Sequence, residues 1–119
     1  GGGGGGAGAA VRLLDRRNRF GLAPLHLAVL GGHAEVAAML LNKGAAPSPA
    51  AADGETPLHL AALHGRLEAA KLLVSFDADL GALDRRGRTP EAAAQAAGRP
   101  GVADYLAVTR LLHRLPARA

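Results

Sequence analysis

Three segments of this chain align with one another at a constant offset of 33 residues. They begin at Gly21, Gly54 and Gly87, and they read GLAPLHLAVLGGHAEVAAMLL, GETPLHLAALHGRLEAAKLLV and GRTPEAAAQAAGRPGVADYLA. Repetition at a period of roughly 20–50 residues is typical of solenoids, in which similar small units stack in a row. Five columns of glycine, proline, alanine, glycine and leucine are identical in all three segments: Gly21/Gly54/Gly87, Pro24/Pro57/Pro90, Ala28/Ala61/Ala94, Gly32/Gly65/Gly98 and Leu40/Leu73/Leu106.

The second segment predicts two short helices. Thr56 is a favoured N-cap residue, and Pro57 follows it at the first helical position, where the missing amide of proline costs no hydrogen bond. Gly65 is expected to end this helix in a left-handed conformation. Apolar residues over 69–73 recur at helical spacing and predict a second helix, after which the turn-rich residues 75–87 lead to the next unit.

The helices of one unit are not expected to be stable alone. Each has only two or three turns, and isolated helices shorter than about 12–15 residues are marginal in water. Alanine supplies much of the apolar content, and aromatic residues make up only 3% of the chain. Because small side chains bury little area each, the core must come from close packing between the helices of neighbouring units.

The residues TPLHLAALHGRLEAAKLLV, preceded by DGE, resemble the ankyrin repeat, and the 33-residue period matches that family. The resemblance covers about residues 18–107. It implies an all-α solenoid of stacked helix-turn-helix units with protruding β-turn or hairpin fingers, used mainly to bind other proteins. In the ankyrin pattern the histidine of this motif bonds backbone near the turn between repeats, which implies a structural role for His26 and His59.

The period also sets the domain organisation. The AAVRLL segment (residues 9–14) is similar to the end of a second helix, but it lies about six residues too close to Gly21 for the regular spacing. The glycine tract before it is interpreted as a linker or an unresolved tail. The expected division is a linker or tail at 1–10, a degenerate N-terminal cap at 11–17, repeats 1, 2 and 3 at 18–50, 51–83 and 84–115, the last with a C-terminal capping helix, and a tail at 116–119.

Repeats 1 and 2 depart from the family pattern near helix ends. Ala23 stands where the family has threonine, which removes a cap worth roughly 0.5–2 kcal/mol. Asp77 stands where Gly44 supplies a glycine one repeat earlier, and aspartate enters the left-handed region less readily than glycine. Pro47 and Pro49 stiffen the first finger and remove two amide donors from any hairpin there.

Repeat 3 departs from the pattern inside its first helix. Glu91 and Ala92 replace the leucine and histidine of the motif. A charge at a position that is buried between repeats is expected only where no further repeat stacks, so repeat 3 is expected to be the C-terminal cap. Its second helix is expected to continue through Val102, Leu106, Thr109 and Leu112 and to end before Pro116.

The resemblance implies that a partner binds on a concave surface, formed by the finger tips and the outward face of the first helices. One end of this surface offers an apolar strip with no evident core role, and such patches commonly mark interaction sites. The alternative for Leu30 and Leu63 in this strip is partial packing between repeats. The other end offers arginines that suit carboxylates or phosphates, or that are simply solvated. The candidate partner-binding residues are Arg19, Phe20, Leu22 and Leu30, then Asp53, Glu55, Leu63 and His64, then Arg85, Arg86 and Arg88.

The sequence therefore predicts a protein-binding module that serves as a scaffold, adaptor or regulator for a partner segment with apolar anchors and acidic residues. The alternative is nucleic-acid or other polyanion binding, since the formal net charge is +4. Few aromatic residues are available to stack on bases, and Phe20, Phe76 and Tyr105 fall in different columns, which excludes an aromatic cage for methyl-lysine. The arginines that could form a polyanion footprint are Arg12, Arg16, Arg17, Arg19, Arg85, Arg86, Arg88, Arg110, Arg114 and Arg118.

No catalytic, metal or cofactor site is expected. The chain contains no cysteine, and no two of its five histidines have the i, i+4 spacing of a helical zinc site. Ser48 and Ser75 have no base placed by a recognised motif, so neither is expected to be a nucleophile. The glycine tract lacks the GK[ST] ending of a phosphate loop.

No membrane span is expected, because the most apolar stretch, residues 22–41, is interrupted by Pro24, glycines and Glu35. No basic and then apolar leader segment is visible. An intracellular location, cytoplasmic or nuclear, is expected from the habit of the family and is compatible with the absence of cysteine. The sequence gives no prediction of the oligomeric state.

Overall fold

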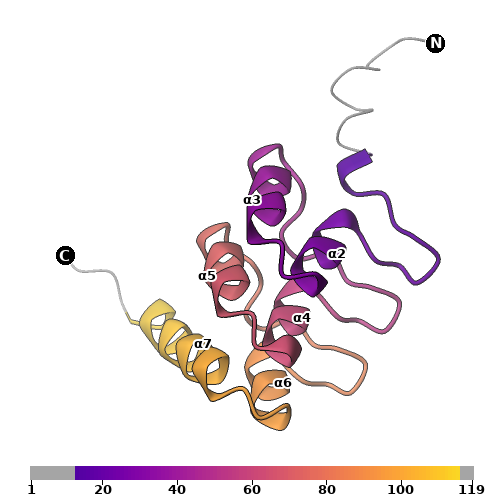
Figure 1. Cartoon of the computed structure of the whole chain (residues 1–119). Coiled ribbons are helices and arrows are strands. Elements are labelled where there is room, and N and C mark those ends of the chain that lie inside the picture. Colours follow the sequence, from indigo (N-terminus) through magenta and orange to yellow (C-terminus); the bar gives the residue numbers. More distant parts are fainter. Residues whose placement is uncertain (1–12, 116–119) are drawn as a thin grey trace, which may run out of the picture.

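The computed structural model describes residues 13–115, which form three successive helix pairs (Figure 1). No β-strand occurs within these residues. The predicted all-α solenoid of helix-turn-helix units is therefore confirmed, and its fingers are turns without strand segments. The pairs are α2 (Pro24–Leu30) with α3 (Ala34–Asn42), α4 (Pro57–His64) with α5 (Leu67–Ser75), and α6 (Pro90–Ala96) with α7 (Pro100–His113).

The six helices form two rows. The first helices α2, α4 and α6 pack against one another in chain order, and α3, α5 and α7 form a second row (Figure 1). The shared alanine column, Ala28, Ala61 and Ala94, is buried in every repeat, so the first helices can approach closely. Leu73 and Leu106 from the shared leucine column are buried between the rows. Small and medium-sized side chains thus fill the core, as the composition predicts.

The first helices of repeats 2 and 3 start at the threonine–proline motif. The hydroxyl of Thr56 accepts a hydrogen bond from the backbone N–H of His59 at 3.3 Å, and that of Thr89 accepts one from Ala92 at 3.2 Å. Ala23 provides no such side-chain bond at the start of α2. The predicted cap at Thr56 and the predicted loss of a cap at Ala23 are both confirmed, and α2 begins with one hydrogen bond fewer than α4 and α6.

Left-handed residues end the helices of repeats 1 and 2. Gly65 follows α4 with a φ of 66°, as predicted. Gly44 and Asp77 occupy one column just after α3 and α5, and their φ angles are 101° and 63°. Arg110 occupies the same column in repeat 3 but is helical, because α7 continues through it. The left-handed residue that ends α3 and α5 is therefore absent from this column of repeat 3, and α7 continues.

The last repeat ends the stack with polar side chains. Glu91 occupies the column of Leu25 and Leu58, which are both buried between repeats. Its side chain is 18% exposed and accepts a hydrogen bond from Arg110 Nε at 2.8 Å. The carboxylate is thus paired within its own repeat, which explains how a charge is accommodated at a position that is apolar in the two preceding layers.

Helix α7 extends as the sequence predicts, since it ends at His113. Val102, Leu106 and Thr109 are buried, whereas Leu112 is exposed. The second helix of repeat 2, α5, has nine residues and α7 has fourteen, so the last part of α7 has no equivalent helix segment beside it.

Several sequence predictions concern residues outside the described range. The linker at 1–10, the tail at 116–119 and most of the segment at 9–14 lie there. Of that segment, Leu13 and Leu14 are described, and both are helical. They lie beside the start of repeat 1, where they line a shallow hollow with Pro24 and Leu40.

Candidate functional site

Each repeat projects a finger that ends in one tight turn. The first residue of each turn donates a backbone hydrogen bond to the fifth: Ala51 to the carbonyl of Glu55 at 2.8 Å, and Asp84 to that of Arg88 at 3.0 Å. The fourth residue of each turn is the first glycine of the repeat. Its φ is positive in all three turns, with a value of 82° at Gly54. The shared glycine column is therefore what closes the fingers.

Neighbouring fingers are joined by main-chain atoms. The N–H of Ala52 donates to the carbonyl oxygen of Phe20 at 3.2 Å, and the N–H of Arg85 donates to that of Asp53 at 2.9 Å. A Cβ atom on Gly21 would lie only 2.7 Å from the nitrogen of Ala52, so the close approach of the first two fingers requires glycine. The three tips thus form one continuous row, visible on the right of Figure 1.

The two motif histidines fix the bases of the fingers. His26 Nε2 lies 2.8 Å from the carbonyl oxygen of Glu55, and His59 Nε2 lies 2.8 Å from that of Arg88. The Nδ1 atom of each ring accepts a hydrogen bond from the backbone N–H three residues earlier, so Nε2 carries the proton and donates. Burial lowers the pKa of His26, which keeps the ring neutral. The structural role that the family resemblance implies for both residues is confirmed.

The first finger carries the most exposed aromatic residue of the candidate surface. Phe20 is 63% exposed, and the guanidinium carbon of Arg19 lies 5.9 Å from the centre of its ring. Leu22 is half-buried. Leu30 and Leu63 are also half-buried, and both pack against the core. Of the two roles that the sequence left open for Leu30 and Leu63, the structure therefore shows partial packing against the core, and their exposed parts stay available to a partner.

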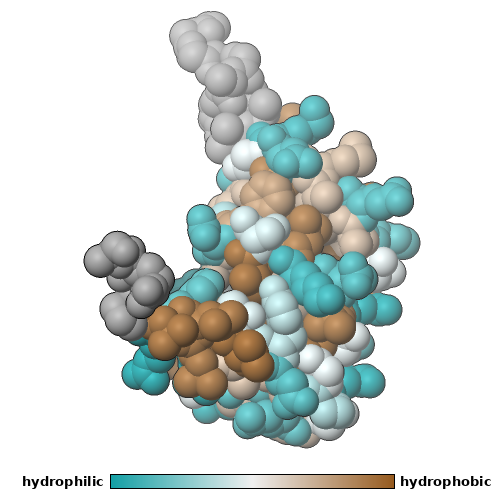
Figure 2. All heavy atoms as spheres, turned by 90° about the vertical axis from the view of Figure 1, so that its left-hand side faces the viewer, coloured by the Kyte–Doolittle hydropathy of each residue, from teal (hydrophilic) through white to brown (hydrophobic). Residues whose placement is uncertain are grey.

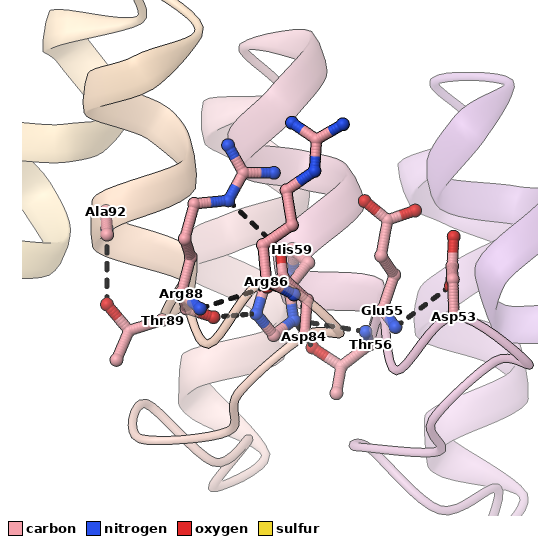
Figure 3. Close-up of polar contacts among 9 residues, drawn as sticks. All are labelled: Asp53, Glu55, Thr56, His59, Asp84, Arg86, Arg88, Thr89 and Ala92. Atoms are coloured by element: carbon pink, nitrogen blue, oxygen red, sulfur yellow. Dashed lines mark hydrogen bonds and ion pairs between the residues drawn. The ribbon is translucent and has the colours of Figure 1, made fainter.

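Residues of the second and third fingers line an open polar hollow of about 320 Å³, and Figure 3 shows most of these side chains. Arg85 and Arg86 are exposed at its edge. Arg88 is not equivalent to them, because its Nε lies 3.3 Å from a carboxylate oxygen of Asp84. The predicted arginine cluster therefore divides into two free tip side chains and one internal ion pair. The residues lining the hollow are Asp53, Glu55, Asp84, Arg85, Arg86 and Arg88.

Asp84 organises the third finger. Its Oδ1 accepts backbone hydrogen bonds from Arg86 and Arg88, each at 2.9 Å. Burial acts to raise the pKa of Asp84, but the two backbone N–H groups and the Arg88 guanidinium outweigh burial, and the pKa lies below its usual value. Asp84 is therefore an ionised structural residue, and it is one that the sequence analysis did not single out.

Glu55 has the opposite electrostatic environment. Burial, a hydrogen bond to the Asp53 side chain and the negative charges of Asp53 and Asp84 raise the pKa of Glu55 to about 7. Figure 3 shows the Glu55 and Asp53 side chains extending in the same direction from the second finger. The hollow thus has an acidic side with one readily protonated carboxyl group and a basic side with two exposed guanidinium groups.

Two arginines that directly precede the second helix of their repeats also join neighbouring repeats, and sequence reasoning missed them. Arg66 Nη2 donates to the carbonyl oxygen of Leu30 at 3.2 Å, and Arg99 Nε donates to that of Leu63 at 3.1 Å. The two arginines are 33 residues apart, so their shared column was a signal that could have found them. They satisfy carbonyl groups at helix C-termini, which otherwise lack partners. His64 is exposed at the end of α4, close to this contact.

The described residues lack two kinds of feature, a group of metal ligands and a membrane-spanning helix. Within residues 13–115, no three His, Asp or Glu side chains are grouped so that they could hold a metal ion. None of the helices between these residues has the length and apolar character that crossing a bilayer requires.

Comparison with known proteins agrees with this architecture. The family model described as ankyrin repeats (3 copies) matches residues 6–84 and, in a second match, residues 48–111. No curated protein matches the chain. Ankyrin repeats are generally protein–protein interaction modules. Since the two matches together span most of the sequence, this chain belongs to the ankyrin repeat family.

Proposed function

We propose that this chain binds a segment of another protein along the row of finger tips and the adjoining ends of α2, α4 and α6, as an intracellular scaffold, adaptor or regulator. The observation that carries the proposal is the joined row itself, with an exposed apolar side chain at one end and exposed guanidinium groups at the other. Main-chain bonds between fingers hold the surface in one shape before a partner arrives, which lowers the entropic cost of binding. No catalytic step belongs to this function.

The first finger supplies the apolar anchor point. Phe20 is free to bury its ring against a partner, and its neighbour Arg19 covers only one side of the ring. Aromatic residues and arginine are the types that contribute most at protein interfaces. Leu22 and the exposed parts of Leu30 and Leu63 extend this apolar region toward the helix ends. A partner with two or three apolar side chains in an extended or helical segment fits this end.

The third finger supplies the charged end. Arg85 and Arg86 can form bidentate bonds to carboxylates of the partner, whereas Arg88 is already paired with Asp84. Asp53 and Glu55 face the same hollow from the second finger. The partner segment is therefore expected to place acidic residues against the third finger and a basic or neutral residue against the second.

The test is a comparison of two charge-matched variants in affinity capture followed by mass spectrometry. One variant combines Phe20→Ala with Arg86→Glu on the fingers. The control carries Lys71→Glu, a similar charge reversal on the exposed face of α5. Proteins that bind through the proposed surface are retained by the parent and the control, and are lost with the finger variant by at least about tenfold. If the finger variant retains the same proteins, the proposal is wrong.

Polyanion binding through the arginines is the alternative outcome. Three of the candidate arginines are engaged within the fold: Arg17 with the carbonyls of Gly21 and Ala50, Arg88 with Asp84, and Arg110 with Glu91. Acidic side chains also line the hollow beside the tip arginines, which weakens its attraction for phosphate. Retention on heparin that falls steeply with salt, and that Arg85→Glu and Arg86→Glu abolish, would favour this alternative.

A further inference from the structure

The first layer of the stack exposes apolar side chains at positions that the next two layers bury. Leu27 is 48% exposed and Val36 is 47% exposed. Their equivalents in repeats 2 and 3 are between 0% and 5% exposed: Leu60, Ala93, Ala69 and Val102. Among the described residues no helix pair precedes α2 and α3 (Figure 1), so these side chains mark a stacking contact that is left open in repeat 1.

Two further columns behave in the same way. Pro24 and Leu40 are half-buried, and their equivalents in repeats 2 and 3 are buried: Pro57, Pro90, Leu73 and Leu106. We call Pro24, Leu27, Val36 and Leu40 the repeat 1 face. The terminal repeats of a solenoid usually close the stack with polar side chains, as Glu91 does in repeat 3. The repeat 1 face is apolar instead, which indicates that it takes an occupant.

The residues before repeat 1 indicate where that occupant lies. Asp15 Oδ1 accepts a hydrogen bond from the N–H of Ala46 at 3.2 Å, and Ser48 Oγ accepts one from the N–H of Asp79 at 2.8 Å. Both bonds span 31 residues, and Asp15 and Ser48 share one column of the repeat. Residues 13–17 therefore follow the register of the linker that comes after a second helix. The linker of a preceding repeat is in place, and the position of its helix pair is open.

Two main-chain groups of the first finger specify the occupant further. In repeat 2 the N–H of Ala52 donates to the first finger, and the carbonyl oxygen of Glu55 accepts a hydrogen bond from His26. Repeat 3 has the same two bonds to repeat 2. The equivalent groups of repeat 1 are the N–H of Arg19 and the carbonyl oxygen of Leu22, and within residues 13–115 no other repeat bonds to them. An occupant with a finger carbonyl and an imidazole donor would satisfy both groups.

Charged residues surround the repeat 1 face and do not determine its occupant. Glu35 shares a column with Glu68, which stays exposed where repeat 1 covers repeat 2. His33 shares its column with the two arginines that donate to the preceding repeat, so it can do the same. Lys43 lines the hollow beside the face, where its equivalent Phe76 packs against the core. The stem of a lysine can lie along an apolar surface while its ammonium group stays in water.

Neither the N-terminal segment of this chain nor a second copy supplies the missing groups. At the 33-residue period, residues 1–9 would form the second helix of a preceding repeat, but they are glycine and alanine only and lack the larger apolar side chains of α3 and α5. The last repeat of a second copy has Glu91 in place of leucine and Ala92 in place of histidine. Two repeat 1 faces placed against each other would leave the carbonyl oxygen of Leu22 without an imidazole donor.

The repeat 1 face differs from a second apolar area, which Figure 2 shows beside the C-terminal end of α7. Val108, an exposed residue of α7, shares its column with Asn42 and Ser75, which are exposed in repeats 1 and 2. No contact inside the stack therefore corresponds to that area. For the repeat 1 face, two such contacts exist, and both have a helix pair as the occupant.

We propose that the repeat 1 face docks the last repeat of an ankyrin array in a partner protein, so that two solenoids join end to end. The docking repeat carries leucine and histidine at the positions of Leu58 and His59, and not the glutamate and alanine of repeat 3. The joint has one direction, because the Glu91–Arg110 pair closes the opposite end of this chain. The proposal does not depend on the function assigned to the finger row.

The probe is this chain with the outer face of its last repeat converted. Glu91→Leu, Ala92→His and Gln95→Ala introduce the residues of repeat 2, and Arg110→Ala removes the arginine that would lose its partner. The probe also carries Val36→Glu, which blocks its own repeat 1 face, and fluorescein on a cysteine added after Ala119. A matched probe carries Val36→Glu and the label but keeps the native last repeat. In anisotropy titrations, the parent chain is expected to bind the converted probe at least about tenfold more tightly than the matched probe.

Variants of the unlabelled chain locate the contact. Leu27→Glu and, separately, Val36→Glu are each expected to weaken binding of the converted probe at least about tenfold, because a carboxylate would be buried in an apolar contact. Val108→Glu changes a valine of similar exposure, 54%, and is expected to leave the affinity unchanged. Far-UV circular dichroism and the melting temperature check that each variant is folded, and Leu27→Gln replaces Leu27→Glu if it is not. Absence of saturable binding, equal affinity for both probes, or an equal loss with Val108→Glu would overturn the proposal.

A covalent form of the joint decides the question if the converted probe does not fold. In this chain a copy of residues 51–83 replaces residues 1–17, which places a fourth repeat in register directly before residue 18. The helices of the copied repeat have eight and nine residues, and neither is expected to be stable alone. The expected result is a gain in helical circular dichroism that Leu27→Glu removes. No gain would mean that the face does not stack a repeat, and the proposal would be wrong.

Two further measurements test the other occupants. Sedimentation velocity of the parent chain is expected to show a monomer, and a dimer that Val36→Glu abolishes would assign the repeat 1 face to a second copy. Deletion of residues 1–12 is expected to leave the affinity for the converted probe unchanged. A gain of at least about tenfold on deletion, together with a lower free energy of unfolding, would assign the face to that segment. Either of these assignments would overturn the proposal.

Discussion

His59 donates a hydrogen bond to the carbonyl oxygen of Arg88, 29 residues further along the chain, at 2.8 Å. The ring is buried and belongs to α4, whereas the carbonyl group belongs to the third finger. The other ring nitrogen accepts the N–H of Thr56 at 3.1 Å. One imidazole thus fixes a helix start and the base of the next finger at the same time, and His26 repeats the arrangement one layer earlier.

The first prediction concerns this histidine. His59→Ala is expected to lower the free energy of unfolding by roughly 2–4 kcal/mol, because it leaves the buried N–H of Thr56 and the carbonyl of Arg88 without partners and opens a cavity. Urea denaturation followed by circular dichroism measures the change. His64→Ala, at an exposed site on the same helix, is expected to change it by less than about 0.5 kcal/mol. Equal effects of the two substitutions would contradict the assigned role.

The second prediction restores the missing cap of repeat 1. Ala23→Thr is expected to raise the free energy of unfolding by about 0.5–1 kcal/mol, since a hydroxyl there can accept an N–H of the first turn of α2, as Thr56 does in α4. Ala23 is buried, but Thr56 is equally buried in the same column, so the larger side chain has a precedent. Ala23→Val has the same shape without the hydroxyl and is expected to give no gain in a urea titration.

The third prediction uses the left-handed column after α3 and α5. Asp77→Gly is expected to stabilise the protein by up to about 1 kcal/mol, because glycine enters a φ of 63° without strain. Gly44→Ala is expected to destabilise it by about 1 kcal/mol, since alanine is strained at a φ of 101° even though no atom lies near its Cβ. Changes of opposite sign in the free energy of unfolding, measured in parallel urea titrations, would support this role of the left-handed column. Changes of the same sign would refute it.

The fourth prediction concerns pH. Glu55 has a pKa of about 7 in the folded protein against 4.5 for a free glutamate, so the folded chain holds this proton more tightly than the unfolded chain. Its contribution therefore makes stability fall as pH rises from about 4.5 to about 7. Glu55→Gln removes that fall, and the variant is expected to be more stable than the parent above pH 7.

Melting temperatures of parent and variant across pH 4–8 measure this difference. The lowered pKa of His26 acts in the opposite direction, because protonation in the unfolded state lowers stability as pH falls below 6.5. His26 is present in both proteins, so the difference between them isolates Glu55. Glu68→Gln, on the exposed face of α5, is the control and is expected to leave the pH profile unchanged. A variant profile parallel to that of the parent would refute the assignment.

The fold was predictable because its signals are local and recur. Thr56, Pro57 and Gly65 each perform one backbone function that their chemistry favours, and the 33-residue period repeats that function. The stop of α3 and α5 also followed from Gly44 and Asp77. The pairing of Glu91 with Arg110 was harder to predict, because it depends on how far α7 continues and on the angle at which it crosses α6.

For the candidate surface, the sequence predicted only which positions of the repeat contribute to it. Column position indicated which residues lie at finger tips, but it could not show that Arg88 turns inward to Asp84 or that Leu30 and Leu63 pack against the core. Those outcomes depend on side-chain rotamers and on the neighbouring repeat. The high pKa of Glu55 likewise depends on the folded structure, first on the burial of its side chain and on the neighbouring Asp53, and to a smaller extent on Asp84 of the third finger.

The bonds between neighbouring fingers involve only main-chain atoms at Phe20, Ala52, Asp53 and Arg85. Side chains at these tips therefore contribute nothing to the hydrogen bonds that hold the row together. Selection can replace them one at a time to acquire a new partner or to abandon an old one, while the glycine and histidine columns keep the scaffold intact. The bonds that join the fingers and the side chains exposed at the tips therefore depend on different atoms, and this separation makes the tips easy to diversify.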